Sequence, residues 1–137
     1  MSDLLNPNQR RSVTIVLRNF EENLRQAEAW LQGAEANGIL YKRKLNLSPA
    51  QWQAAQQRVA AALEQIASLA QEIGLEPEVE DASGLIRGEM SVDWTNLSDL
   101  RSRKMKRYGD INPELKSVLD PAIQRLAQLA MELASIF

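Results

Sequence analysis

The sequence predicts an all-α protein, an antiparallel up-down-up-down four-helix bundle with a Pro-kinked fourth helix. A capping residue followed by proline, a typical helix start, occurs at Asn6-Pro7, Ser48-Pro49 and Asn112-Pro113. Downstream of these starts, apolar residues recur in steps of three and four, as on one face of a helix. The 137 residues, 45% of them hydrophobic, suffice for one core, so we expect a single domain over residues 1–137.

The first helix is predicted from Pro7 to about Ala36, where Asn37-Gly38 ends it. Val16 and Trp30 widen its apolar seam, which comprises Val13, Leu17, Phe20, Leu24, Ala27, Leu31 and Ala34. The apolar residues of the following loop, 38–47, are expected to cover one end of the bundle.

The stretch from Ser48 to Gly74 is the best-marked helix in the chain. Ser48 is a good N-cap, Gln51 completes a capping box, and Gly74 supplies a left-handed end. Its predicted seam has a period of about 3.5 residues and comprises Trp52, Ala55, Val59, Ala62, Ile66, Leu69 and Ile73. Such a seam requires packing partners.

The third helix is less clearly bounded. An acidic, proline-containing loop follows Gly74, and one helix from about Ala82 to Tyr108 keeps one face apolar. A later start near Asp93 or Ser98 is the competing interpretation, and odd–even alternation over 85–94 also allows a short extended piece. Gly109 is predicted to end this helix.

The fourth helix is predicted to begin at Asn112-Pro113-Glu114 and to be the most apolar segment. Val118, Ile123, Ala130 and Phe137 widen its seam, which comprises Leu115, Leu119, Ala122, Leu126, Leu129, Leu133 and Ile136. Pro121 either kinks the helix or, with Asp120 as a cap, restarts it after a one-turn break. We expect a bend over residues 118–120.

Composition narrows the chemistry that this chain can support. It has no cysteine and no histidine, so disulfides, thiolate metal sites, histidine phosphotransfer and di-iron sites that need Glu-x-x-His pairs are excluded. We therefore expect no cofactor, no metal site and no catalytic residue. With no signal peptide or apolar span recognised, the expected location is the cytoplasm, and no membrane partner is expected.

Two groups of cations are the candidate anion or partner sites. One group holds five cations within seven residues, and the other lies in the loop after the first helix; together they are Arg101, Arg103, Lys104, Lys106, Arg107, Lys42, Arg43 and Lys44. On an α-helix the first five do not form one narrow stripe, and the chain has a net charge of −2, whereas nucleic-acid binders are usually basic. Solvation, or pairing with the chain's own acids, is therefore the favoured interpretation.

By elimination, the sequence favours a non-enzymatic protein that acts by association, with itself as a homodimer or with another protein. The surplus of apolar positions on the fourth helix supports this hypothesis. The second hypothesis is a binder of nucleic acid or a phosphorylated ligand through residues 101–107, helped by residues 42–44. A helical enzyme that uses carboxylates or Arg and Lys is the third.

Overall fold

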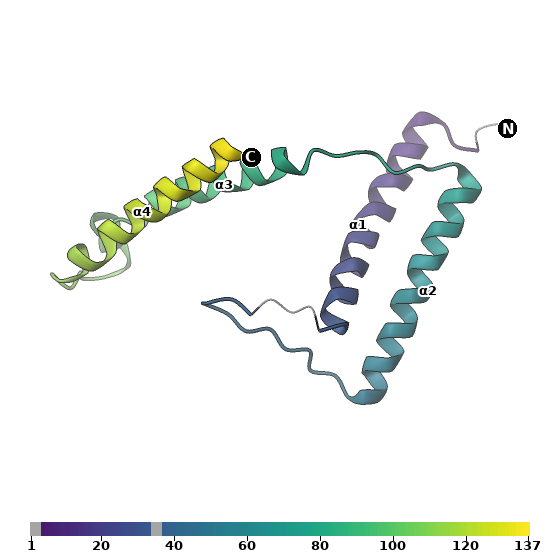
Figure 1. Cartoon of the computed structure of the whole chain (residues 1–137), viewed down its shortest axis with the longest axis horizontal. Helices are drawn as coiled ribbons and strands as arrows, with labels where there is room; N and C mark the ends of the chain where they lie inside the picture. The colour runs from purple at the N-terminus through teal and green to yellow at the C-terminus, as the bar shows by residue number, and fades with distance from the viewer. Residues whose placement is uncertain (1–3, 34–36) are drawn as a thin grey trace. The chain divides into compact units, whose positions relative to one another are not determined.

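The computed structural model describes residues 4–33 and 37–137, and these residues form helices and loops without a strand. The prediction of an all-α protein is therefore confirmed. The chain divides into two compact units, Met1–Glu78 and Val79–Phe137. Each unit holds one pair of long antiparallel helices (Figure 1). The four-helix bundle and the single domain stay predictions.

The first unit contains α1 (Pro7–Leu31) and α2 (Pro49–Ile73). Both helices begin at the predicted cap and proline, and both have a capping box, predicted for Ser48 but not for Asn6. In each box the cap residue exchanges hydrogen bonds with the glutamine three residues later. Gly74 ends α2 in the left-handed conformation, with φ of 73°. The boundaries predicted for α2 are therefore confirmed.

The end predicted for α1 is wrong. The helix ends at Leu31, with Gln32 as its C-cap, and Gly33 follows with φ of 78°. Gly33 thus provides the left-handed residue that ends the helix, upstream of the predicted end at Asn37-Gly38, because glycine adopts this conformation without a steric cost. The predicted terminus at Ala36 lies outside the described residues.

The packing of α1 on α2 follows the predicted seams. All seven seam residues of α2 are half-buried and none is fully buried. On α1, Leu24 and Leu31 are buried, whereas Val16 and Phe20 are 66% and 48% exposed. One helix covers only part of its partner's apolar face, so this unit leaves apolar surface uncovered.

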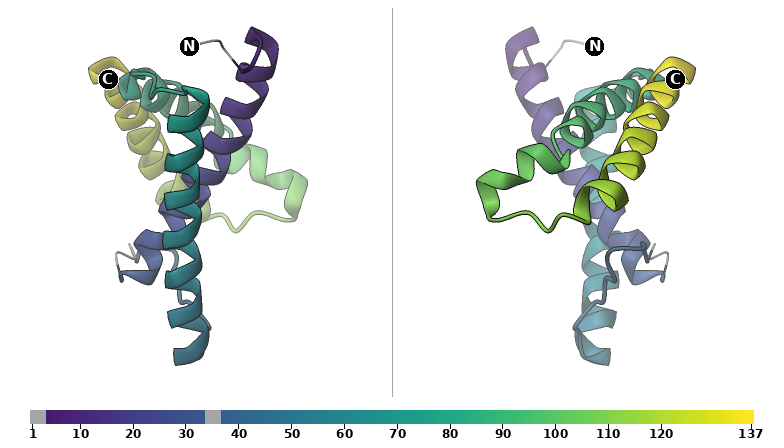
Figure 2. Two further views of the ribbon diagram at one scale, coloured as in Figure 1. Left: turned by 90° about the vertical axis from the view of Figure 1, so that its right-hand side faces the viewer. Right: turned by 90° about the vertical axis from the view of Figure 1, so that its left-hand side faces the viewer.

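The second unit contains α3 (Ala82–Ser98), the 3-10 helix η1 (Ser102–Tyr108) and α4 (Leu115–Ile136). α3 and α4 lie side by side in both views of Figure 2 and pack on each other. The early start of α3 at Ala82 is confirmed, and the start near Asp93 or Ser98 and the extended piece over 85–94 are wrong.

The single helix predicted from Ala82 to Tyr108 is wrong as well. α3 ends at Ser98, and the chain turns before η1 begins, with Gly109 ending η1 instead of a long α-helix. No proline or glycine marks this break in the sequence. Two interactions of the following residues accompany it, an ion pair of Asp99 with Lys104 and hydrogen bonds of Ser102 with Asp120.

α4 begins at Leu115, later than predicted, because Asn112 folds into a turn in which its Oδ1 accepts a hydrogen bond from the backbone N–H of Glu114, at 2.9 Å. The helix runs through Pro121 without a break, so a fresh start capped by Asp120 is wrong. The kink stays a prediction.

Candidate functional site

The face of α4 that packs on α3 is rotated from the predicted seam. Ile123, Ala127 and Ala130 are the buried residues of α4. Leu115 and Leu119 of the predicted seam are half-buried. At about 100° per residue, the remaining seam positions lie on an adjacent face. We call this face the exposed α4 strip; it comprises Val118, Ala122, Leu126, Leu129, Leu133 and Ile136.

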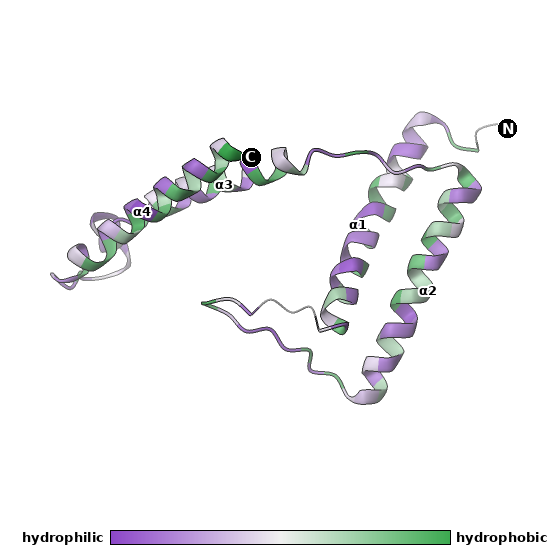
Figure 3. Ribbon diagram, viewed as in Figure 1, coloured by the Kyte–Doolittle hydropathy of each residue, from purple (hydrophilic) through white to green (hydrophobic). Residues whose placement is uncertain are grey.

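The exposed α4 strip is largely uncovered within its own unit, where only Leu129 among its described residues is half-buried. Val118 and Ile136 are 73% and 76% exposed, and Leu126 and Leu133 in the middle are 48% and 39% exposed. The hydropathy colouring of α4 shows apolar residues along the whole helix (Figure 3). An amphipathic helix in a folded protein normally buries a strip of this width.

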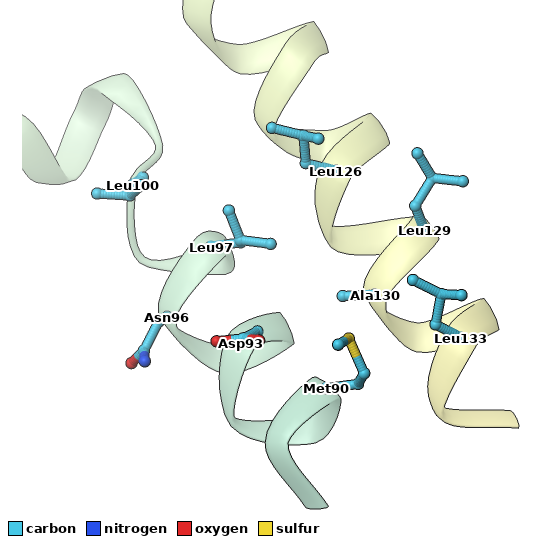
Figure 4. Close-up of a pocket in the computed structure, with 9 residues that line it drawn as sticks. All are labelled: Met90, Asp93, Asn96, Leu97, Leu100, Leu126, Leu129, Ala130 and Leu133. Atoms are coloured by element: carbon cyan, nitrogen blue, oxygen red, sulfur yellow. The ribbon is translucent and has the colours of Figure 1, made fainter. Parts of the chain in front are cut away.

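An apolar groove runs between α3 and α4, beside the strip (Figure 4). Its volume is about 550 Å³. Its lining comprises Met90, Asp93, Asn96, Leu97, Leu100, Leu126, Leu129, Ala130 and Leu133. Seven of these nine residues are apolar, and Asp93 and Asn96 add polar groups from α3. The buried core of a protein–protein interface is likewise predominantly apolar.

The five cations at 101–107, here called the basic cluster, lie on η1 and on its N-cap, Arg101. In a 3-10 helix, residues three apart share an edge, at about 2.0 Å rise per residue. Arg103 and Lys106 therefore lie on one edge, and Lys104 and Arg107 on another. The third edge contains Ser102, which is 5% exposed. The segment is thus not α-helical as predicted, but its five cations, divided between two edges and the N-cap, do not form one narrow stripe here either.

Asp120 of α4 fixes the start of η1. Its Oδ1 accepts a hydrogen bond from the backbone N–H of Ser102 at 2.8 Å, and its Oδ2 accepts one from Ser102 Oγ at 2.9 Å. These bonds, first of all the one from the backbone, hold the pKa of Asp120 below its ordinary value of 3.8, and the charges of Lys116 and Arg101 act in the same direction. Asp120 thereby caps a helix distant in sequence.

Part of the basic cluster is already engaged. Lys104 Nζ lies 2.6 Å from Asp99 Oδ1, and this hydrogen bond and the charge of Lys104 lower the pKa of Asp99. The guanidinium of Arg107 lies 5.2 Å from the centre of the Tyr108 ring. Arg103 and Lys106 are exposed and form no ion pair with any residue that the structure describes.

The second cation group lies in the other unit, after α1. Lys42, Arg43 and Lys44 are all exposed. The Arg43 guanidinium lies over two aromatic rings, 4.6 Å from the centre of Tyr41 and 5.7 Å from that of Trp30. Arg43 is therefore held by cation–π contacts of its own unit.

The described residues contain no group of three or more acidic residues placed to hold a metal ion. Among the same residues, no helix has the length and apolarity needed to cross a membrane. Comparison with known proteins adds no relative: no protein family, curated protein or solved structure matches this chain. Sequence reasoning anticipated surplus apolar surface on the fourth helix but missed the groove, because its α3 wall depends on how the two helices pack.

Proposed function

We propose that this protein acts by associating with a protein partner, and that the apolar groove and the exposed α4 strip are the surface it uses. The observation that carries the proposal is an aliphatic groove beside a helix face whose central leucines, Leu126 and Leu133, are 48% and 39% exposed. A continuous apolar surface of this kind on a folded protein marks an interaction site. No catalysis is part of the proposal.

The single-chain up-down-up-down bundle is the competing way to cover these side chains, and it stays a proposal. It is supported by the exposed apolar residues that the first unit also has, such as Val16 and Phe20. The two proposals differ in the mass of the particle. A chain whose four helices bury their apolar faces against one another is monomeric, and it binds little of a dye specific for exposed apolar surface.

Two single substitutions on α4 test the association surface. Leu126 and Met131 are each 48% exposed, but only Leu126 lines the groove. Leu126→Glu places a charge where a partner would exclude water, so it should weaken association by at least about tenfold. Met131→Glu is the matched control and should leave association unchanged. Circular dichroism should show equal helix content for both variants.

The measurement is particle mass by light scattering, together with stoichiometric capture of a partner. Unmodified protein should form particles of more than one chain, or hold one partner per chain, and Leu126→Glu should lose this property. A monomeric protein without any stoichiometric partner would refute the proposal, as would equal effects of the two substitutions.

A second candidate function is binding of a phosphate-bearing ligand, such as nucleic acid, by the basic cluster. The observation that favours it is the edge of η1 on which Arg103 and Lys106 lie exposed, about 6 Å apart along the helix. Arg103→Glu with Lys106→Glu should abolish retention on a nucleic-acid column, and retention of unmodified protein should fall steeply with salt. Lys42→Glu with Lys44→Glu tests whether the second cation group contributes. Failure of unmodified protein to bind the column at low salt would eliminate this candidate.

A further inference from the structure

We propose that the occupant of the apolar groove is a second copy of this chain, with α4 of each copy packed antiparallel against α4 of the other. This inference rests on the proposed function and names its partner. Two independent properties of α4 support it, the order of side-chain sizes along the exposed α4 strip and the placement of charge beside it.

The exposed α4 strip is complementary to its own reversed copy. With a two-fold axis between Leu126 and Leu129, Leu126 lies opposite Leu129 of the second copy. The same register places Ala122, the smallest residue of the strip, opposite Leu133 of the second copy. Ala122 thus faces Leu133 on both sides of the axis, and Leu126 and Leu129 meet at its centre. Self-complementarity of this kind is what a two-fold symmetric interface requires.

Charge on the free flank of α4 fits the same arrangement. Arg125 and Glu132 immediately precede Leu126 and Leu133 in the sequence, so at about 100° per residue they share one flank of the strip. The flank on the other side is packed on α3 through Ile123 and Ala130, which are 6% and 5% exposed. Only the flank with the two charges is open to a partner.

In an antiparallel helix pair, equivalent flanks face each other. Arg125 of one copy therefore faces Glu132 of the other, and the two-fold axis repeats the pair in the opposite direction. Both side chains are exposed, and Arg125 has no ion pair within the described part of the chain. Glu132 accepts a hydrogen bond from Gln128 through Oε1, at 3.3 Å, and its second oxygen accepts none from the residues that the structure describes. The flank thus carries charges of opposite sign at reciprocal positions.

α3 and the turn after it supply the rest of the proposed interface. Met90 and Leu97 of α3, with Leu100 in the turn after it, form the wall of the groove opposite the α4 leucines (Figure 4). A helix laid along the strip also covers this wall, so α3 and α4 of two copies together form a four-helix arrangement. Each copy then buries the strip that its own α3 leaves uncovered.

Charge exchange in the full-length chain tests this geometry. Arg125→Glu alone places glutamates opposite each other at two sites of the dimer, and Glu132→Arg alone places arginines there. Each single variant should weaken self-association by about tenfold. The double variant, Arg125→Glu with Glu132→Arg, restores opposite charges and should return to the unmodified affinity. An equal mixture of the two single variants should form a heterodimer in preference to either homodimer.

Analytical ultracentrifugation over a range of protein concentrations measures the affinities, and native mass spectrometry identifies the species in the mixture. Circular dichroism checks that each variant is folded, and rescue by the double variant separates a pairing effect from loss of structure. If no charge variant changes the dimer affinity but Leu126→Glu disrupts the dimer, the antiparallel pairing is wrong and the association function is retained. A monomer that binds a different protein through Leu126 would overturn self-association alone. A monomer without a partner would overturn both.

Discussion

Ile123 gives the most direct test of the packing between α3 and α4. It is 6% exposed, and Ile123→Ala removes three of its carbon atoms. At about 0.8 kcal/mol for each buried carbon, the loss of burial destabilises the unit by about 2.4 kcal/mol. The better helix propensity of alanine offsets about 0.4 kcal/mol of this loss. A decrease of about 2 kcal/mol in the free energy of unfolding is therefore the minimum. A cavity that does not collapse raises the decrease to about 4 kcal/mol.

Val92→Ala in the same unit is the matched control. Val92 is 59% exposed on α3 and does not line the groove. Its two lost carbons are covered only in part, which amounts to about 0.7 kcal/mol, and the higher helix propensity of alanine offsets about 0.6 kcal/mol. The expected change is close to zero.

Urea unfolding followed by tryptophan fluorescence measures both variants. Trp94 lies in α3, so replacing Trp30 and Trp52 by phenylalanine leaves it as the single reporter, in the unit under test. Protein concentration is held constant, because association adds to apparent stability. If Ile123→Ala costs no more than Val92→Ala, Ile123 is not in a core, and the packing of α3 on α4 described above is wrong.

Three further expectations concern the caps. Because its folded-state pKa is lowered, Asp120 contributes stability that is fully present above its ordinary pKa of 3.8 and is lost as pH falls through the lower folded value. Asp120→Asn, or loss of the hydroxyl in Ser102→Ala, should therefore flatten this part of an acid-unfolding curve. Ser48→Ala should reduce the stability of the first unit by about 1 kcal/mol, seen in thermal unfolding by circular dichroism, and an unchanged curve would refute the capping box. Gly74→Ala should cost about 1 kcal/mol because of its positive φ of 73°, whereas Gly88→Ala, in a helix with open space around the glycine, should gain up to about 1 kcal/mol; equal signs would contradict the assignment.

Features encoded within a few residues were predictable from the sequence. The starts of α1 and α2 depend on a capping residue, a proline and a glutamine within four positions, and α2 keeps all seven of its predicted seam residues on one half-buried face. The start of α3 at Ala82 follows from Asp81, whose Oδ1 accepts a hydrogen bond from the backbone N–H of Ser83.

Features that depend on distant residues were not predictable. The end of α3 at Ser98 accompanies the hydrogen bonds between Ser102 and Asp120, eighteen positions apart, and no local signal announces it. The conformation of the basic cluster follows from that break. α4 is apolar over a wide arc, so its sequence does not determine which part of the arc packs on α3. In the structure the packed face is centred on Ile123 and Ala127.

The bond pair between Ser102 and Asp120 constrains how this chain can diverge. Each residue contributes to the structure of this segment through the other, because the hydroxyl and N–H of Ser102 donate to the carboxylate of Asp120. Substitutions at positions 102 and 120 should therefore occur together in related sequences. Where the acid at 120 is replaced, the hydroxyl at 102 should be replaced too, and the segment 102–108 should adopt another conformation.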